Sequence, residues 1–306
     1  MRKKILITGG TGFIGYHLAK KCIKLNWLVT SVSTNKPLKL RKLPYVKYLF
    51  LDISNIKNIK KKLSKDFDYI VNLAGYVDHT KSNKVMKSHY LGCKNLSMFF
   101  KESKIKKFVQ IGSCIEYGKK KSPQKEDKNI FNKTYSVYGK AKLMSTRFLL
   151  NLYKESNFPV TILRLYLVYG THQDPNRIIP ITIMNSLKNN EFECSKGTQI
   201  RDFLYIDDLI SAIIKVLKSK KSIGEIFNIG SGKPIMIRNI IYKIHKIIKS
   251  GKPLFGKIKF RRDEIMKLYP NTSKIKKILS WKQKININVG LKKTIAFYKK
   301  KYVQES

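Results

Sequence analysis

Hydrophobic positions in the first part of the chain alternate between two periods. Lys4–Thr8 is a short apolar run, Phe13–Leu25 repeats apolar residues at helical spacing, and Trp27–Ser33 is apolar and β-branched again. Buried strands of parallel sheets are short apolar runs, whereas the helices that cover them carry one apolar stripe. These segments therefore predict a strand, a helix and a second strand, which together form a β-α-β unit.

The same alternation continues along most of the chain. Further predicted strands are Val46–Leu51, Tyr69–Leu73, Phe108–Ile111 and Val160–Leu165; further predicted helices are Ile56–Leu63, Met86–Glu102, Ser136–Tyr153, Ile178–Leu187, Ile206–Leu217 and Ile237–Ile248. Strands that alternate with helices form parallel sheets with helices on both faces. The pattern predicts the α/β class, as a Rossmann-type doubly wound parallel sheet.

A glycine-rich segment follows the first predicted strand and opens the first predicted helix. It reads Gly9, Gly10, Thr11, Gly12, Phe13, Ile14 and Gly15. Glycines allow the backbone to turn tightly and to approach a pyrophosphate, while the helix N-terminus supplies N–H donors and a positive dipole. In this strand–glycine–helix context the motif predicts dinucleotide binding, with cofactor contacts at the motif's residues other than Gly10.

The end of the second predicted strand bears on the choice between NAD and NADP. An acidic residue about 20 residues after the glycines would bind the adenosine ribose hydroxyls, but this position holds Ser33 and no carboxylate is nearby. Ser33 is suited to hydrogen-bond a ribose 2′-phosphate, which Lys36, Lys39 or Arg41 would neutralise. NAD(P) is the expected cofactor, with a slight preference for NADP.

We expect residues 1–165 to form the NAD(P)-binding domain and residues 166–306 to form mainly a small mixed substrate-binding cap. Segments near 202–232 are expected to return to the first domain. No internal repeat or Gly/Ser-rich linker interrupts the chain. Ligands of open parallel sheets bind beyond the carboxyl ends of the strands, so the crevice between sheet and cap is the expected binding site.

Composition changes this interpretation little. Lys and Arg number 64 against 19 Asp and Glu, giving a formal charge of +45, yet 42% of residues are hydrophobic and a sizeable core is possible. Such a charge favours anionic partners. The lysines are spread along the whole chain and no nucleic-acid-binding motif accompanies them, so we expect a phosphorylated small molecule and no nucleic acid.

Cysteine spacing and the N-terminus indicate the compartment. Four scattered cysteines, with no CxxC pair, favour a reducing environment without a zinc site or disulfide framework. The apolar run after the basic N-terminus is too short for a signal peptide, and no segment approaches the roughly 18 apolar residues of a membrane span. We expect a cytoplasmic protein with no metal and no membrane contact.

A second group of residues has the composition of a proton-transfer site. Tyr138 and Lys142 are four residues apart and share one helix face, and Ser113 follows a predicted strand. A nearby ammonium is expected to lower the pKa of the Tyr138 phenol from about 10 toward the working pH. Ser113 would hold a substrate oxygen that the phenol protonates or deprotonates. We predict these three residues to be catalytic.

Together these motifs resemble the extended short-chain dehydrogenase/reductase family, in its nucleotide-sugar epimerase, dehydratase and ketoreductase branch. The resemblance extends over nearly the whole chain and includes Gly9–Gly15, Asp52–Ile53, Asn72–Gly75, Gly92–Asn95, Ser113–Gly118, Tyr138–Lys142, Arg164–Gly170, Arg201–Phe203, Asn228–Gly230, Ser273–Lys274 and Trp281. It implies a nucleoside-diphosphate sugar as substrate and a homodimer as the assembly. It also implies hydride transfer at a sugar carbon, C4 being the expected one.

The resemblance also assigns binding residues. Asp52 and Ile53 would flank the adenine, and Leu73, Ala74 and Gly75 would lie beside the cofactor. Substrate phosphates would be bound by Arg201, Arg261 and Arg177. These roles are carried over from the family, residue by residue.

Departures from the family pattern narrow the reaction. Dehydratases carry Asp and Glu directly after the Ser/Thr, whereas this chain has Cys114 and Ile115, which cannot supply that acid and base. His89 stands where the family often has Asn, and Leu167 stands at another position where the family usually has Asn. We expect an epimerase, with a 4-keto-6-deoxysugar reductase as the alternative. A nucleic-acid-binding relative without activity is a third, weaker alternative.

Overall fold

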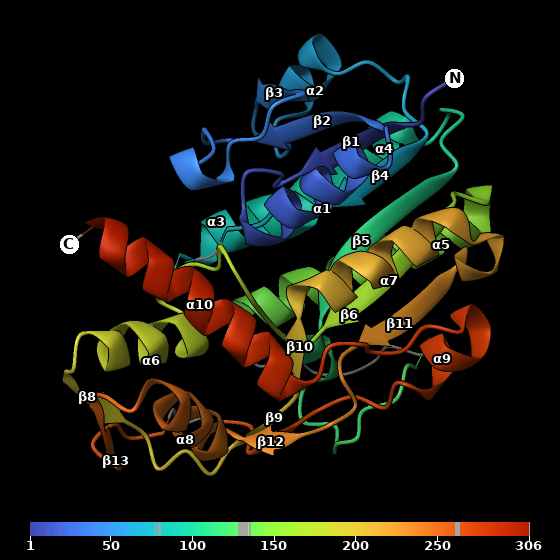
Figure 1. Ribbon diagram of the computed structural model, residues 1–306. Helices are drawn as coiled ribbons and strands as arrows, with labels where there is room; N and C mark the ends of the chain where they lie inside the picture. The colour runs from blue at the N-terminus through green and yellow to red at the C-terminus, as the bar shows by residue number, and fades with distance from the viewer. Residues whose placement is uncertain (77, 79–80, 128–133, 135, 261–263, 306) are drawn as a thin grey trace.

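The computed structural model describes residues 1–76, 78, 81–127, 134, 136–260 and 264–305. Within that part of the chain the central sheet has seven strands, all parallel, in the order β11-β6-β5-β4-β1-β2-β3 (Figure 1). The strands are β1 (Lys4–Thr8), β2 (Leu28–Ser33), β3 (Val46–Phe50), β4 (Tyr69–Asn72), β5 (Lys107–Ser113), β6 (Val160–Leu165) and β11 (Glu225–Ile229). The predicted doubly wound parallel sheet is confirmed.

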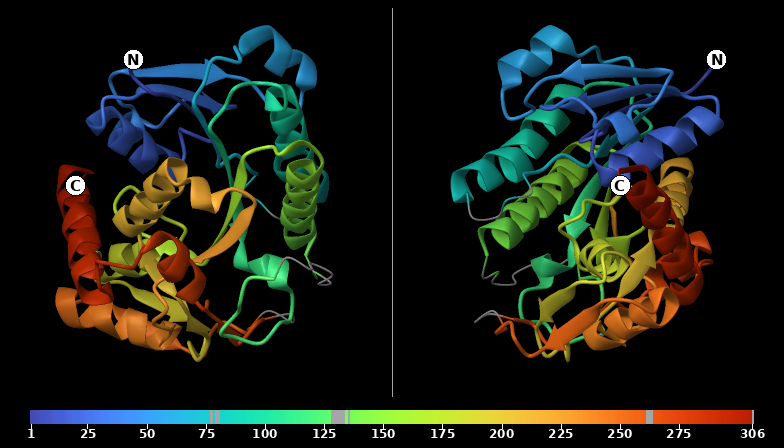
Figure 2. Two further views of the ribbon diagram at one scale, coloured as in Figure 1. Left: turned by 90° about the vertical axis from the view of Figure 1, so that its right-hand side faces the viewer. Right: turned by 60° about the vertical axis from the view of Figure 1, so that its left-hand side comes forward.

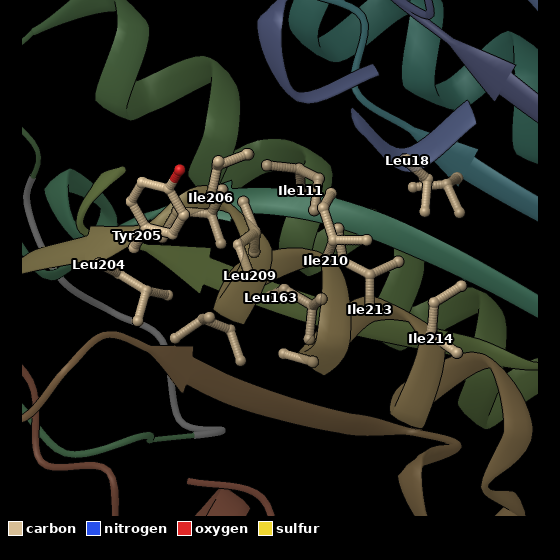
Figure 3. Packing of buried hydrophobic residues seen from close by; sticks show 14 of the residues in the cluster. Leu18, Ile111, Leu163, Leu204, Tyr205, Ile206, Leu209, Ile210, Ile213 and Ile214 are labelled. Atoms are coloured by element: carbon tan, nitrogen blue, oxygen red, sulfur yellow. The ribbon is translucent and has the colours of Figure 1, made fainter. Parts of the chain in front are cut away.

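Alternate residues of the central strands point into two separate cores. One core joins Ile5 and Ile7 of β1 to α1 (Phe13–Lys24) and α7 (Ile206–Lys218). The other joins Leu6 of β1 to α2 (Ile56–Lys62), α4 (Gly92–Phe100) and α5 (Val137–Ser156). Figure 3 shows the first core, where Leu18 of α1 and Ile210, Ile213 and Ile214 of α7 lie near Ile111 and Leu163 of the sheet. Because both faces are covered, β5 and β6 are buried along their whole length.

Segments after β6 build the smaller part of the molecule. Three small sheets pair β10 (Phe203–Tyr205) with β7 (Leu167–Tyr169), β13 (Lys252–Phe255) with β8 (Glu191–Cys194), and β9 (Ile200–Arg201) with both β12 (Ile235–Met236) and β14 (Lys267–Leu268). Helices α6 (Ile178–Leu187), α8 (Ile237–Ile248) and α10 (Ile287–Glu305) pack together beside them. Figure 2 shows this part at the opposite end of the molecule from β1–β3.

The segment between residues 202 and 232 contributes to the larger part. It contains α7 and β11, and β11 pairs with β6 at the edge of the central sheet. Helix α7 also packs beside α1. Helix α9 (Ser273–Leu279) then packs on β11.

The strands and helices differ from the sequence predictions in one interrupted helix and in several short strands. The helix predicted over Met86–Glu102 begins earlier, as α3 (Ser82–Met86), and is interrupted by a π-helical turn, η2 (Lys87–Leu91), before α4. The short strands β7–β10 and β12–β14 were not predicted. Runs of two to four residues give little or no sign of a period of two, so their pairing depends on tertiary contacts.

An aromatic cluster joins the first helix to the C-terminal helix. The His172 ring lies 4.5 Å from the ring of Tyr16 in α1 and 4.4 Å from the ring of Phe297 in α10. His17 Nε2 donates a hydrogen bond to the Thr171 carbonyl, 2.8 Å away. Burial lowers the pKa of both His17 and His172 to about 4.

This cluster predicts a loss of stability in acid. The unfolded chain binds protons at these histidines near pH 6.5, while the folded chain resists them until about pH 4. The free energy of unfolding therefore falls as pH decreases from 6.5 to 4, because the unfolded state holds more protons. His172→Asn should reduce that slope by up to about 1.4 kcal/mol per pH unit, measured by urea denaturation at several pH values. His245→Asn in α8 is the matched control, and equal slopes in wild type and His172→Asn would contradict the assignment.

Candidate functional site

The glycine-rich segment forms a tight turn between β1 and α1. Gly9 has a φ of +67° and donates its N–H to the Val32 carbonyl at 2.7 Å. A Cβ at Gly15 would lie 2.5 Å from both the Gly10 Cα and the Gly9 carbonyl oxygen. Gly12 is the N-cap of α1 and has no side chain to cap it. The free N–H groups at this end of α1 and the open backbone fit the pyrophosphate of a dinucleotide.

The end of β2 lies beside this turn. Ser33 accepts a hydrogen bond from the Thr11 N–H at 3.3 Å. Arg41, one of the three candidate cations for a 2′-phosphate, is buried and donates to the His172 carbonyl at 2.6 and 3.0 Å and to the Asp174 carboxylate at 2.6 Å. That guanidinium is committed to the protein, so Lys36 and Lys39, which are exposed, remain as candidates.

Residues expected to contact the cofactor follow β3 and β4. Asp52 is exposed and its carboxylate accepts the Ser54 N–H at 2.8 Å, while Ile53 is buried. After β4, Leu73 approaches the glycine turn so closely that a Cβ at Gly9 would lie 2.9 Å from its carbonyl. Ala74 N–H points toward the Thr8 hydroxyl and the Asn72 side-chain oxygen, 3.4 and 3.3 Å away, and Gly75 is exposed. The turns after β1 and β4 therefore lie side by side.

The structure brings Ser113, Tyr138 and Lys142 together. Ser113 ends β5 and caps the short helix η3 (Cys114–Tyr117), whose Ile115 N–H it accepts. Tyr138 and Lys142 lie in the first two turns of α5, which begins after the N-cap Ser136. The Ser113 side chain interacts with the Tyr138 phenol, and the Lys142 ammonium lies 5.9 Å from the centre of the Tyr138 ring.

The Tyr138 pKa shifts in the opposite direction to the one expected. Desolvation raises the pKa of the phenol to about 12, although its hydrogen bond with Ser113 and the charge of Arg177 both favour the phenolate. The Lys142 ammonium donates instead to the Ile111 carbonyl at 2.7 Å, and burial lowers its own pKa to about 8. Spacing alone predicted proximity correctly but could not show that burial outweighs the charge.

A buried ion pair lies directly beneath Ser113. Glu116 and Arg164 are both fully buried, with the Arg164 Nε 3.0 Å from the Glu116 carboxylate. The same carboxylate accepts the Ser113 N–H at 2.7 Å and the hydroxyl of Thr146, in α5, at 2.8 Å. Glu116 thus joins β5, β6 and α5 at the one place where all three catalytic candidates meet. We did not predict this role, because no local pattern links residues so distant in sequence.

Apolar side chains surround the position that follows Ser113. Cys114 is buried with Tyr166 and Leu268, and Ile115 and Ile265 pack against them. Desolvation raises the pKa of the Cys114 thiol to about 12. A neutral thiol and an aliphatic side chain supply neither the acid nor the base that water elimination requires.

The three candidate phosphate ligands differ in their surroundings. Arg201 lies in β9, pairs with Glu264 and donates to the Ile200 carbonyl at 2.9 Å. Arg177 is exposed at the N-cap of α6, near enough to Tyr138 for its charge to favour the phenolate. Arg261 lies outside the described residues.

Two buried tyrosines have hydrogen-bond partners within the protein. The Tyr166 hydroxyl donates to Gln124 at 2.8 Å, and the Tyr169 hydroxyl donates to the Ile287 carbonyl at 3.4 Å, so both are core aromatics. Among the described residues no cluster of His, Cys, Asp and Glu is suited to hold a metal. In the same part of the chain no helix has the length and apolar character needed to span a membrane.

Comparisons with known proteins identify a family signature. The sequence model of the NAD dependent epimerase/dehydratase family matches residues 5–230. The chain is 29% identical over 307 residues to CDP-abequose synthase of Salmonella muenchen, covering 97% of this chain and 98% of that protein. It is 33% identical over 275 residues to dTDP-D-glucose 4,6-dehydratase of Dictyostelium discoideum, covering 80% and 62% respectively.

A solved structure agrees over the whole chain. The UDP-glucuronic acid 4-epimerase from Bacillus cereus, in complex with UDP-glucuronic acid and NAD, superimposes with a TM-score of 0.86 at 27% identity. The match covers 98% of this chain and 100% of that one.

The buried ion pair predicts a specific loss of stability. Glu116→Gln keeps the shape of the side chain but leaves the Arg164 guanidinium buried without a compensating charge. We expect the free energy of unfolding to fall by about 3–5 kcal/mol in urea denaturation. Glu191→Gln is the matched control, because its exposed pair with Lys252 should contribute at most about 1 kcal/mol. Equal losses of unfolding free energy in the two variants would contradict the stabilising role of the Glu116–Arg164 pair.

Proposed function

Because the chain belongs to the NAD-dependent epimerase/dehydratase family, confirming the resemblance inferred from its motifs, we propose that it is a nucleoside-diphosphate-sugar 4-epimerase. The proposed substrate is a sugar linked to a nucleoside diphosphate, and the proposed reaction inverts C4 by removing a hydride and returning it to the opposite face. The observation that carries the proposal is the convergence of Ser113, Tyr138 and Lys142 at the carboxyl end of β5.

The glycine turn, Ser33 and the turn after β4 are proposed to hold NAD(P), which when bound supplies the hydride acceptor and donor. Tyr138 is the proposed proton carrier. Its neutral phenol is the form that donates to a ketone oxygen, and its phenolate accepts the hydroxyl proton in the reverse direction. Ser113 stabilises that phenolate and is placed to share the same substrate oxygen. Lys142 adds positive charge beneath the phenol.

Dehydration fits this site poorly, although dehydratases are among the relatives. Elimination of water needs an acid and a base beside the sugar, and the two residues after Ser113 are Cys114 and Ile115. Both lie in apolar surroundings. Because neither residue supplies an acid or a base, the site favours a reaction confined to one carbon of the sugar.

The remaining assignments extend the proposal. Arg177 is the proposed ligand for substrate phosphates, with Arg201 and Arg261 as further candidates. Residues 1–165 with the returning segments near 202–232 are proposed as the cofactor-binding domain and the rest as the substrate cap. The proposal also includes a preference for NADP over NAD, because the sequence has no carboxylate near Ser33. It further includes assembly as a homodimer.

A second candidate is a nucleoside-diphosphate 4-keto-6-deoxysugar reductase. The observation that favours it is the similarity to CDP-abequose synthase along nearly the full length of both chains. Such an enzyme uses the same three residues but consumes reduced cofactor at each turnover.

A ligand screen tests both candidates. Thermal unfolding is measured with NAD, NADP and a panel of UDP-, GDP-, CDP- and dTDP-sugars, because a ligand that binds the native state raises the melting temperature. Cofactor that remains bound through purification favours the epimerase, whereas stoichiometric NADPH oxidation with a keto sugar favours the reductase. Failure of every nucleotide sugar to stabilise the protein would overturn both.

Tyr138→Phe tests the proposed proton carrier. The variant keeps the ring and its packing but removes the hydroxyl, so turnover should fall by about 100-fold or more. Cofactor binding, followed by thermal shift, should stay close to wild type. Near-normal turnover in this variant would exclude the assigned role.

A further inference from the structure

His89 connects the proton-transfer site to the proposed cofactor site. It lies in the π-helical turn η2, is 6% exposed, and its ring meets the Tyr138 ring edge to face, with centres 5.0 Å apart and planes at 76°. Its Nε2 lies 3.2 Å from the Tyr76 carbonyl, in the turn after β4. Its main-chain carbonyl accepts the Ser145 hydroxyl, in α5, at 2.8 Å.

The turn after β4 fits closely against the same ring. A Cβ at Gly75 would overlap the imidazole of His89, so the glycine and the histidine occupy complementary space. The ring therefore packs between the turn that carries Ala74 and Gly75 and the helix that carries Tyr138. A π-helical turn inserts one residue into the helical register and re-aims the side chains around it.

We propose that His89 is a positioning residue that fixes the Tyr138 ring against the turn after β4 and excludes water from that face of the phenol. Only the expected effect of His89 on turnover rests on the proposed function. The contacts themselves join the imidazole to the Tyr138 ring, Nε2 to the Tyr76 carbonyl, and the His89 carbonyl to the Ser145 hydroxyl, and they do not depend on which substrate is bound.

The surroundings of the phenol define what a test must control. Besides His89, the groups that act on the Tyr138 phenol are Ser113, Cys114 and Glu116 from the end of β5 and from η3, and Arg177 from the start of α6. Lys142 lies below it on the same helix. None of these is altered by substitution of His89, and desolvation is the largest influence on the phenol.

The test is a fluorine NMR titration of 3-fluorotyrosine incorporated at position 138. Tyr138 is half-buried, and in the His89→Ala background more water reaches the face that His89 covers, so the pKa of the fluorophenol should fall by about one unit relative to the parent. His89→Phe keeps an aromatic ring in place and should retain the parent pKa. His245→Ala, on α8, is the control that should also retain it. Equal pKa values in the parent and in His89→Ala would overturn the proposal.

A second variant covers the case in which His89→Ala does not fold. His89→Asn fills part of the space with a polar side chain and should give a smaller pKa decrease of the same sign. An unchanged value would count against the proposal.

Turnover gives a further readout with UDP-glucose as the probe. His89→Ala should lower kcat by about 10-fold with KM unchanged, and His89→Phe should restore most of it, because only the alignment of the phenol is affected. Absence of turnover in the wild type would count against the proposed function with this substrate, while the titration would still decide the role of His89. A proportional rise in KM without loss of kcat would contradict positioning.

Discussion

The buried pair of Glu116 and Arg164 is the interaction on which the site depends. Neither side chain has any exposure, and one carboxylate accepts from the Ser113 main chain, from Thr146 and from Arg164. Removing two charges from water is costly, and the hydrogen bonds that Glu116 accepts must stay in place to offset part of that cost, because both terminal nitrogens of Arg164 are buried without a hydrogen-bond partner. That requirement tolerates little relative movement of β5, β6 and α5. The position of Ser113 beside Tyr138 is therefore maintained by the buried ion pair of Glu116 and Arg164.

Desolvation also governs the proton chemistry above that pair. Desolvation raises the pKa of the half-buried Tyr138 to about 12, and burial lowers that of Lys142 to about 8, so both groups are driven toward their neutral forms. The phenol then retains its proton until a partner stabilises the phenolate, and Ser113 and Arg177 are the described groups that do so. A phenol that keeps its proton in this way suits the role of proton donor proposed for Tyr138, because a developing alkoxide is the stronger base.

Sequence patterns predicted what depends on neighbours along the chain. The bounds of β1, β6 and α6 agree with the apolar runs, and the glycine turn lies where its spacing placed it. The patterns did not predict features that depend on contacts between segments distant in the chain. Arg41 was a candidate for a phosphate until the fold placed the His172 carbonyl and Asp174 beside it. The spacing of Tyr138 and Lys142 gave their shared face, but the sign of the pKa shift required the burial that only packing defines.

Three of the few carboxylates lie inside the protein rather than beside the surface lysines. Asp202 and Asp208 are buried and accept main-chain N–H groups, from Ser231 in one case and from Lys284 and Ile285 in the other. Glu116 is committed to Arg164. Acidic side chains used as internal hydrogen-bond acceptors cannot neutralise surface lysines. The resulting field attracts an anionic ligand at long range, but salt screens it beyond about 10 Å. We therefore expect selection among anions to come from short-range contacts, and Arg177 is an exposed cation close to Tyr138.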